Sequence, residues 1–151
     1  MAKQRDDMET AHPLKGQQDQ KRIPVSRSGG RKVFIDRSDS LPNGGRLIVD
    51  IDERLTIGVF RLENELYAYE NTCAHSGGPI CQGRILPRVL EVMDDAKQIH
   101  GQNWDESDMH IVCPWHGFEY SIKTGRHAGD SKIHLRSFPV HETEGDIYVE
   151  V

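Results

Sequence analysis

The sequence lacks a long apolar run, and this absence sets the first limit on its function. No stretch among the 151 residues approaches the roughly 18 apolar residues that a membrane-spanning helix needs. The segment from Met1 to Thr10 is charged and no apolar core follows it, so we expect no secretory signal. We therefore expect a cytoplasmic protein that does not bind membranes.

An excess of basic charge is also missing. The chain has 19 Lys and Arg residues against 24 Asp and Glu residues, which gives a net charge of -5. A nucleic-acid-binding protein normally concentrates basic residues that replace the counterions of the phosphates. We therefore expect no nucleic-acid partner.

Cysteine is scarce, and its number is odd. Three cysteines in a chain without a secretory signal do not predict a disulfide framework. In a reducing compartment, their expected uses are metal ligation, redox chemistry or burial. The eight histidines supply possible co-ligands, so the composition favours a metal or redox site.

The chain divides into a polar leader and a β-rich domain. Residues 1–30 are dense in Gln, Asp, Lys and Arg and cannot bury enough apolar surface to fold, which predicts a flexible leader, or alternatively a partner-binding arm. Residues 31–151 contain short β-type runs separated by Gly-marked turns, which predict a small, all-β, antiparallel sandwich or barrel. The runs are 32–35, 46–51, 56–62, 66–69, 109–112, 118–122, 135–140 and 147–151.

One segment departs from the β pattern. Between Pro87 and Gln102, apolar residues recur at helical spacing, with Pro87 suited to a helix start and Gly101 to a helix stop. The sequence therefore predicts one amphipathic helix, at about residues 87–100, inserted into the β domain.

Two short motifs each combine a cysteine with a histidine. They are Cys73-Ala-His75-Ser-Gly-Gly-Pro and Cys113-Pro-Trp-His116-Gly, and each follows a predicted strand. Two such loops side by side can present two thiolates and two imidazoles to a metal centre. Because imidazole is neutral and thiolate is anionic, a [2Fe–2S] cluster with this ligand set is less negative than an all-cysteine cluster and has a higher reduction potential.

These two motifs closely resemble the cluster-binding loops of Rieske iron–sulfur proteins. The resemblance extends over residues 31–151 and includes the run Leu-Tyr-Ala-Tyr-Glu-Asn before the first motif and Ser-Phe-Pro-Val near the end. The resemblance implies one Rieske-type [2Fe–2S] cluster, with Cys73 and Cys113 on the buried iron and His75 and His116 on the iron nearer solvent. A Cys₂His₂ zinc site and a Cys–His nucleophile pair are the alternatives, but zinc fingers usually order their ligands as Cys-Cys then His-His.

The resemblance also indicates the subtype. Respiratory-complex Rieske proteins carry an extra cysteine in each loop, joined as a disulfide, and the matching positions here are Gly78 and Trp115. Phe118 stands where those proteins often have a serine, and Tyr120 where they have a tyrosine that reaches a ligand sulfur. Fewer hydrogen-bond donors stabilise the reduced cluster less, so we expect a potential in the lower part of the Rieske range of about -150 to +300 mV.

The gap between the two motifs is long for such a protein. Thirty-seven residues separate His75 from Cys113, about twice what a Rieske ferredoxin needs, and the excess lies at about 85–108. This insertion is either a surface excursion packed on the domain or a docking element for a reductase, an oxygenase or a second copy of the chain.

We expect Cys81 to be a free thiol or a small packed residue. The remaining histidines, His100, His110, His127, His134 and His141, are expected at the surface or in turns.

The resemblance implies a soluble ferredoxin rather than a catalytic subunit. Such a protein passes single electrons from a flavin-containing reductase to a terminal oxygenase, often one that attacks an aromatic ring. The alternatives are the small subunit of an assimilatory nitrite reductase and a Rieske module used for redox sensing or assembly.

Overall fold

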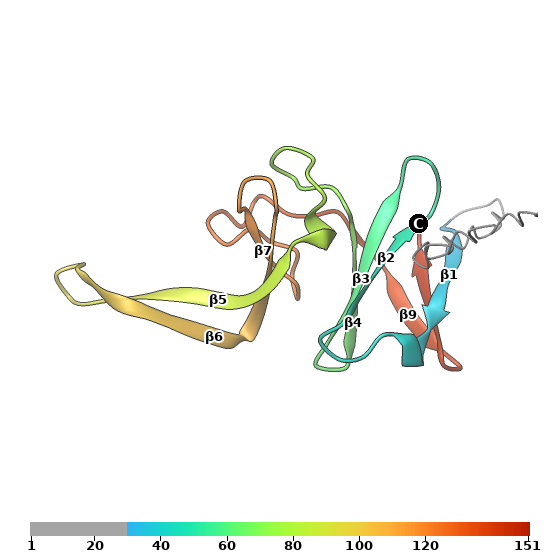
Figure 1. Cartoon of the computed structure of the whole chain (residues 1–151), viewed down its shortest axis with the longest axis horizontal. Helices are drawn as coiled ribbons and strands as arrows, with labels where there is room; N and C mark the ends of the chain where they lie inside the picture. Colours follow the sequence, from blue (N-terminus) through green and yellow to red (C-terminus); the bar gives the residue numbers. More distant parts are fainter. Residues whose placement is uncertain (1–29) are drawn as a thin grey trace, which may run out of the picture.

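The computed structural model describes residues 30–151, and this part of the chain is an all-β domain without α-helices (Figure 1). The predicted leader, apart from Gly30, lies outside the described residues. The strands are β1 Lys32–Arg37, β2 Arg46–Asp50, β3 Thr56–Leu62, β4 Glu65–Glu70, β5 Arg84–Met93, β6 Ile99–Val112, β7 Glu119–Ser121, β8 Ser137–Phe138, β9 Val140–Thr143 and β10 Asp146–Glu150. Every predicted β-type run contains or overlaps one of these strands, so the all-β prediction is confirmed.

The strands form three antiparallel sheets. Their orders are β1-β10-β9, β2-β3-β4-β8 and β5-β6-β7. A first core joins the first two sheets, and it includes Val33 of β1, Val59 of β3 and Val149 of β10. Apolar side chains alternate along β10, as expected for a strand with one face on a core.

The central sheet is covered on both faces, because a second core joins it to the β5-β6-β7 sheet. Val59 belongs to the first core and its neighbour Phe60 to the second, so β3 is buried without alternation. Gly58 allows this close packing, since a Cβ atom there would lie 2.5 Å from the Cβ of Cys81. Cys81 is a free, buried cysteine in this second core, as expected.

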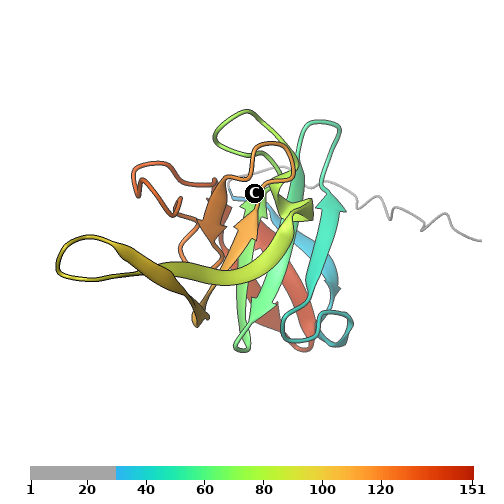
Figure 2. The same ribbon diagram turned by 60° about the vertical axis from the view of Figure 1, so that its left-hand side comes forward.

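The predicted helix at about residues 87–100 is wrong, since these residues belong to a long hairpin of β5 and β6 (Figures 1 and 2). Asp94 fixes the turn: its Oδ1 accepts hydrogen bonds from the backbone N–H groups of Ala96 and Gln98, and Lys97 has a φ of 60°. A helix gains most of its stability by packing an apolar face on the domain. No such packing forms here, because Leu90, Val92 and Met93 are exposed. The interpretation of this segment as a stripe packed on the domain is therefore also wrong.

Within residues 30–151, no helix is long and apolar enough to cross a membrane.

Candidate metal centre

Two loops share one backbone design. In the first, which follows β4, Cys73 N donates to the Gly78 carbonyl and Gly77 N donates to the Cys73 carbonyl, both at 2.8 Å. In the second, between β6 and β7, Cys113 N donates to the Phe118 carbonyl at 2.8 Å and Gly117 N donates to the Cys113 carbonyl at 3.0 Å. Gly77 and Gly117 have φ values of 75° and 73°, a conformation that favours glycine. Each loop thus turns sharply within five residues of its cysteine.

The structure brings the four predicted site residues together. Cys73 and Cys113 are each 3% exposed and interact with each other through their thiols. His75 and His116 are exposed, and their ring centroids lie 4.9 Å apart at an interplanar angle of 90°. The site therefore has its sulfur atoms inside the domain and its imidazoles at the surface.

Hydrogen-bond donors surround both thiols. Burial opposes ionisation of Cys73, but hydrogen bonds from the Tyr120 hydroxyl and from the backbone N–H groups of His75 and Ser76 outweigh it, so the pKa of Cys73 is lowered. Burial raises the pKa of Cys113, although the backbone N–H groups of Trp115 and His116 donate to it. The protein thus offers five donors to two sulfur atoms, an arrangement that suits anionic sulfur.

Tyr120 is the side-chain donor in this group. Its hydroxyl lies 3.4 Å from Cys73 Sγ, and its ring is fully buried beneath the site. Burial, followed by the interaction with Cys73, raises the pKa of Tyr120, so the phenol keeps its proton at neutral pH. A thiolate can only accept, and Tyr120 therefore donates to Cys73 once the thiol is ionised.

Trp115 packs on the other loop, at the positions where the respiratory subtype carries its disulfide. A Cβ atom on Gly78 would lie 2.9 Å from the Trp115 ring and 3.1 Å from Cys113 Sγ. Any side chain at position 78 would therefore displace the indole or the sulfur. The contact between Trp115 and Gly78 joins the two loops without a covalent bond.

His127, expected only at the surface or in a turn, packs beside the site. Phe118 stacks on His75 with ring centroids 3.9 Å apart and an interplanar angle of 8°, and His127 packs against Phe118 at 4.8 Å. His127 Nδ1 accepts hydrogen bonds from the backbone N–H groups of Gly129 and Asp130, which fixes the ring. No local motif pairs His127 with the two loops, so the sequence carries no signal for this contact.

His110 was expected at the surface or in a turn, and this prediction is wrong because it is a buried residue of β6. Its Nε2 lies 3.0 Å from Asp108 and its Nδ1 lies 3.3 Å from Glu119, while Ser121 donates to Asp108 at 2.7 Å. These contacts join β6 and β7 at the base of the second loop. They hold the strand ends from which Cys113 and His116 project.

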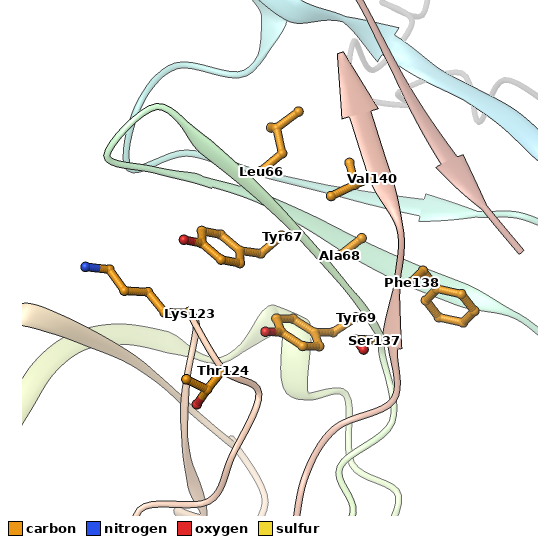
Figure 3. A pocket seen from close by; sticks show the side chains of 9 residues that line it. All are labelled: Leu66, Tyr67, Ala68, Tyr69, Lys123, Thr124, Ser137, Phe138 and Val140. Atoms are coloured by element: carbon orange, nitrogen blue, oxygen red, sulfur yellow. The ribbon is translucent and has the colours of Figure 1, made fainter.

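A groove lies apart from these loops, between β4, β8, β9 and the turn at Lys123 and Thr124 (Figure 3). Tyr67, Tyr69 and Phe138 contribute to its lining, and the Tyr69 hydroxyl donates to the Ile122 carbonyl at 2.8 Å. It contains none of the four predicted site residues.

The donor set of the loops fits the cofactor that the resemblance implies. The two buried thiols interact with each other and the two exposed imidazole rings lie edge to face, while the backbone and Tyr120 supply donors to the sulfurs only. A [2Fe–2S] group with two cysteines on one iron and two histidines on the other requires this segregation of ligand types.

Comparison with known proteins gives the family. The family model described as the Rieske [2Fe-2S] domain matches residues 31–139. A ferredoxin subunit of the 3-phenylpropionate/cinnamic acid dioxygenase of Escherichia coli (strain K12) is 25% identical over 115 residues, covering 74% of this chain and 85% of that protein.

Two solved structures have the same fold. The ferredoxin of carbazole 1,9a-dioxygenase from Nocardioides aromaticivorans IC177 aligns with a TM-score of 0.54 and 22% identity, over 78% of this chain and 95% of that chain. A putative NADH-dependent nitrite reductase small subunit from Mycobacterium tuberculosis aligns with a TM-score of 0.61 and 18% identity, over 82% and 97% of the two chains. Because the family model matches well over half of the chain, the protein belongs to the Rieske [2Fe-2S] family, and its cofactor is a Rieske-type [2Fe–2S] cluster.

Proposed function

We propose that this protein is a one-electron carrier that accepts electrons from a flavin-containing reductase and passes them to a terminal oxygenase, one that acts on an aromatic ring. The observation that carries the proposal is the asymmetry of the metal centre. The thiols are buried, whereas the imidazoles of His75 and His116 are exposed at the surface. An electron can leave such a site through the imidazole edge once a partner covers it.

Cys73 and Cys113 hold one iron in this proposal, and His75 and His116 hold the other. The cluster supplies one-electron redox chemistry when bound. The chain keeps water from the sulfurs by burying both cysteines, stabilises negative charge on them with backbone N–H groups and Tyr120, and orients His75 by stacking it on Phe118. The midpoint potential is expected in the lower part of the Rieske range.

The relatives support an electron-transfer component rather than a catalytic subunit. The Escherichia coli relative is named as the ferredoxin subunit of a dioxygenase, and its sequence aligns over most of both chains. One structure with this fold is a complex of oxygenase and ferredoxin from carbazole 1,9a-dioxygenase. The nitrite reductase small subunit shares only the fold at 18% identity, and we therefore favour the oxygenase system.

The cluster assignment is tested with full-length protein purified without oxygen. We expect two irons and two sulfides per chain and, after reduction with dithionite, an EPR signal whose average g value lies below that of the free electron. Cys73→Ser and His116→Ala should each abolish this spectrum. The matched controls are Cys81→Ala and His141→Ala, a buried cysteine and an exposed histidine outside the two loops, and both should retain it. One zinc and a featureless visible spectrum would overturn the proposal.

The partner assignment is tested by purification from the natural source. A carrier elutes alone, and its reduced form loses its electron to an added ring-hydroxylating oxygenase. Co-elution with a large sirohaem–flavin protein would instead identify a nitrite reductase subunit.

A further inference from the structure

The hairpin of β5 and β6 extends beyond the sheet that supports it. β7 pairs only with His110–Val112 of β6, so residues 88–108, here called the arm, form a two-stranded ribbon whose outer part has two open edges. Both views show the arm projecting away from the other two sheets (Figures 1 and 2). A two-stranded ribbon without further strands gains little stability from its own pairing, so the outer part of the arm would be stabilised if another surface covered it.

The arm exposes apolar side chains on both of its faces. Val89 pairs with Trp104, and Met93 pairs with Ile99, which places these four residues on one face. Leu90 and Val92 alternate with them and lie on the other face. Trp104 is 56% exposed and Met93 is 57% exposed. The polar pair Glu91 and Gln102 lies between the two apolar pairs of the first face. Several exposed large apolar side chains on one segment of a polar protein still mark an interaction surface.

The arm is acidic, and another segment of the same chain is basic. The arm carries six carboxylates against Arg88 and Lys97, whereas residues 123–136 carry four basic side chains against the single carboxylate of Asp130. Among residues 30–151, Glu91 and Glu106 of the arm form no ion pair, and neither do Arg126 and Lys132 of the basic segment. One surface of this chain therefore complements another surface of the same chain.

We propose that the arm is a dimerisation element that lies on the basic segment 123–136 of a second copy of this chain. The contact is reciprocal, because a two-fold axis places each arm on the basic segment of the other copy and buries the apolar faces between the copies. A redox partner, by contrast, has to approach His75 and His116, which lie on the two loops and not on the arm. The arm itself therefore lies outside the surface through which the electron leaves, although the basic segment includes His127, which packs on Phe118 beside His75.

The mass of the full-length holoprotein tests this inference by sedimentation and by light scattering across a wide range of concentrations. We expect a species of twice the 17.2 kDa of one chain, which dissociates as salt screens the charges. Trp104→Ser should weaken the dimer about tenfold or more, as expected for a central aromatic residue. Ile48→Ser is the matched control, because Ile48 is an exposed apolar residue of β2, outside the arm, and should leave the dimer unchanged.

Charge exchange separates self-association from other contacts. Arg126→Glu with Lys132→Glu should weaken the dimer about tenfold, and adding Glu91→Lys with Glu106→Lys to the same chain should restore it. The inference would be overturned by a protein that stays monomeric at all concentrations. It would also be overturned if Trp104→Ser left the dimer unchanged, or if the four combined charge reversals failed to restore the dimer. A wild-type monomer in which Trp104→Ser slows electron delivery to an oxygenase would assign the arm to the redox partner instead. The visible spectrum of each variant shows whether the cluster is intact. A failure of the proposed function can therefore be distinguished from a failure of the dimer.

Discussion

Replacing Tyr120 by phenylalanine should lower the reduction potential by about 40 mV. The change removes a hydroxyl that lies 3.4 Å from Cys73 Sγ and keeps the ring in its fully buried position. A hydrogen bond to a charged group is worth about 1.5–3 kcal/mol. We expect the reduced, more negative state to gain about 1 kcal/mol more from this bond than the oxidised state, and 1.4 kcal/mol corresponds to about 59 mV for one electron.

The assay is a potentiometric titration of the purified protein, monitored through its visible absorption spectrum. Tyr69→Phe is the matched control, because Tyr69 is also buried but its hydroxyl donates to the Ile122 carbonyl at 2.8 Å and not to a sulfur. Tyr69→Phe should cost about 1 kcal/mol of stability and leave the potential unchanged. An unchanged or raised potential in Tyr120→Phe, with a full complement of iron, would refute the role assigned to this hydroxyl.

Three further predictions concern the domain around the metal centre. The Cys81 thiol should resist alkylation in the native protein because burial raises its pKa to about 12, and mass spectrometry after iodoacetamide treatment checks this. Gly58→Ala should cost about 1–3 kcal/mol in a urea titration, and Cys81→Ala in the same chain should recover part of that loss, since the new methyl group meets Cys81. Burial opposes ionisation of Asp108, but hydrogen bonds from Ser121 and His110 outweigh it and lower its pKa. Ionised Asp108 therefore stabilises the fold fully above its pKa in the unfolded chain, about 3.9, and this stabilisation is lost as the pH falls through its lower pKa in the folded protein. In that acidic range the urea midpoint of Asp108→Asn should consequently fall less steeply than that of the wild type.

The juxtaposition of the two Cys/His loops could be predicted because each loop is a local motif in the sequence. Each cysteine lies within three residues of its histidine and four residues before a glycine, and each follows a strand run. His110 and His127 could not be placed in the same way. His110 has one local partner, Asp108, but its contact with Glu119 depends on the pairing of β6 with β7. His127 meets Phe118 only through the path of the later loop.

The arm shows why hydrophobic periodicity alone failed for one segment. Val89, Leu90, Val92 and Met93 fit one face of a helix, but they also fit a strand that is apolar on both faces. The deciding information lies in the turn chemistry of Asp94 and in the absence of a covering surface within residues 30–151. A ribbon that is apolar on both faces is the pattern for which helix and strand periods are most easily confused.

The two loops show that the backbone, rather than the histidine spacing, sets the sulfur environment. His75 comes two residues after its cysteine and His116 three residues after its own, yet both thiols receive N–H donors from the second and third residues that follow them. The glycine at the fourth position imposes the same turn on each loop. The two loops can therefore carry their histidines at different positions after the cysteine. Both sulfur atoms nevertheless keep the same backbone hydrogen-bond donors. Tyr120 donates to only one of the two sulfurs, so the side chains introduce the electrostatic difference between them.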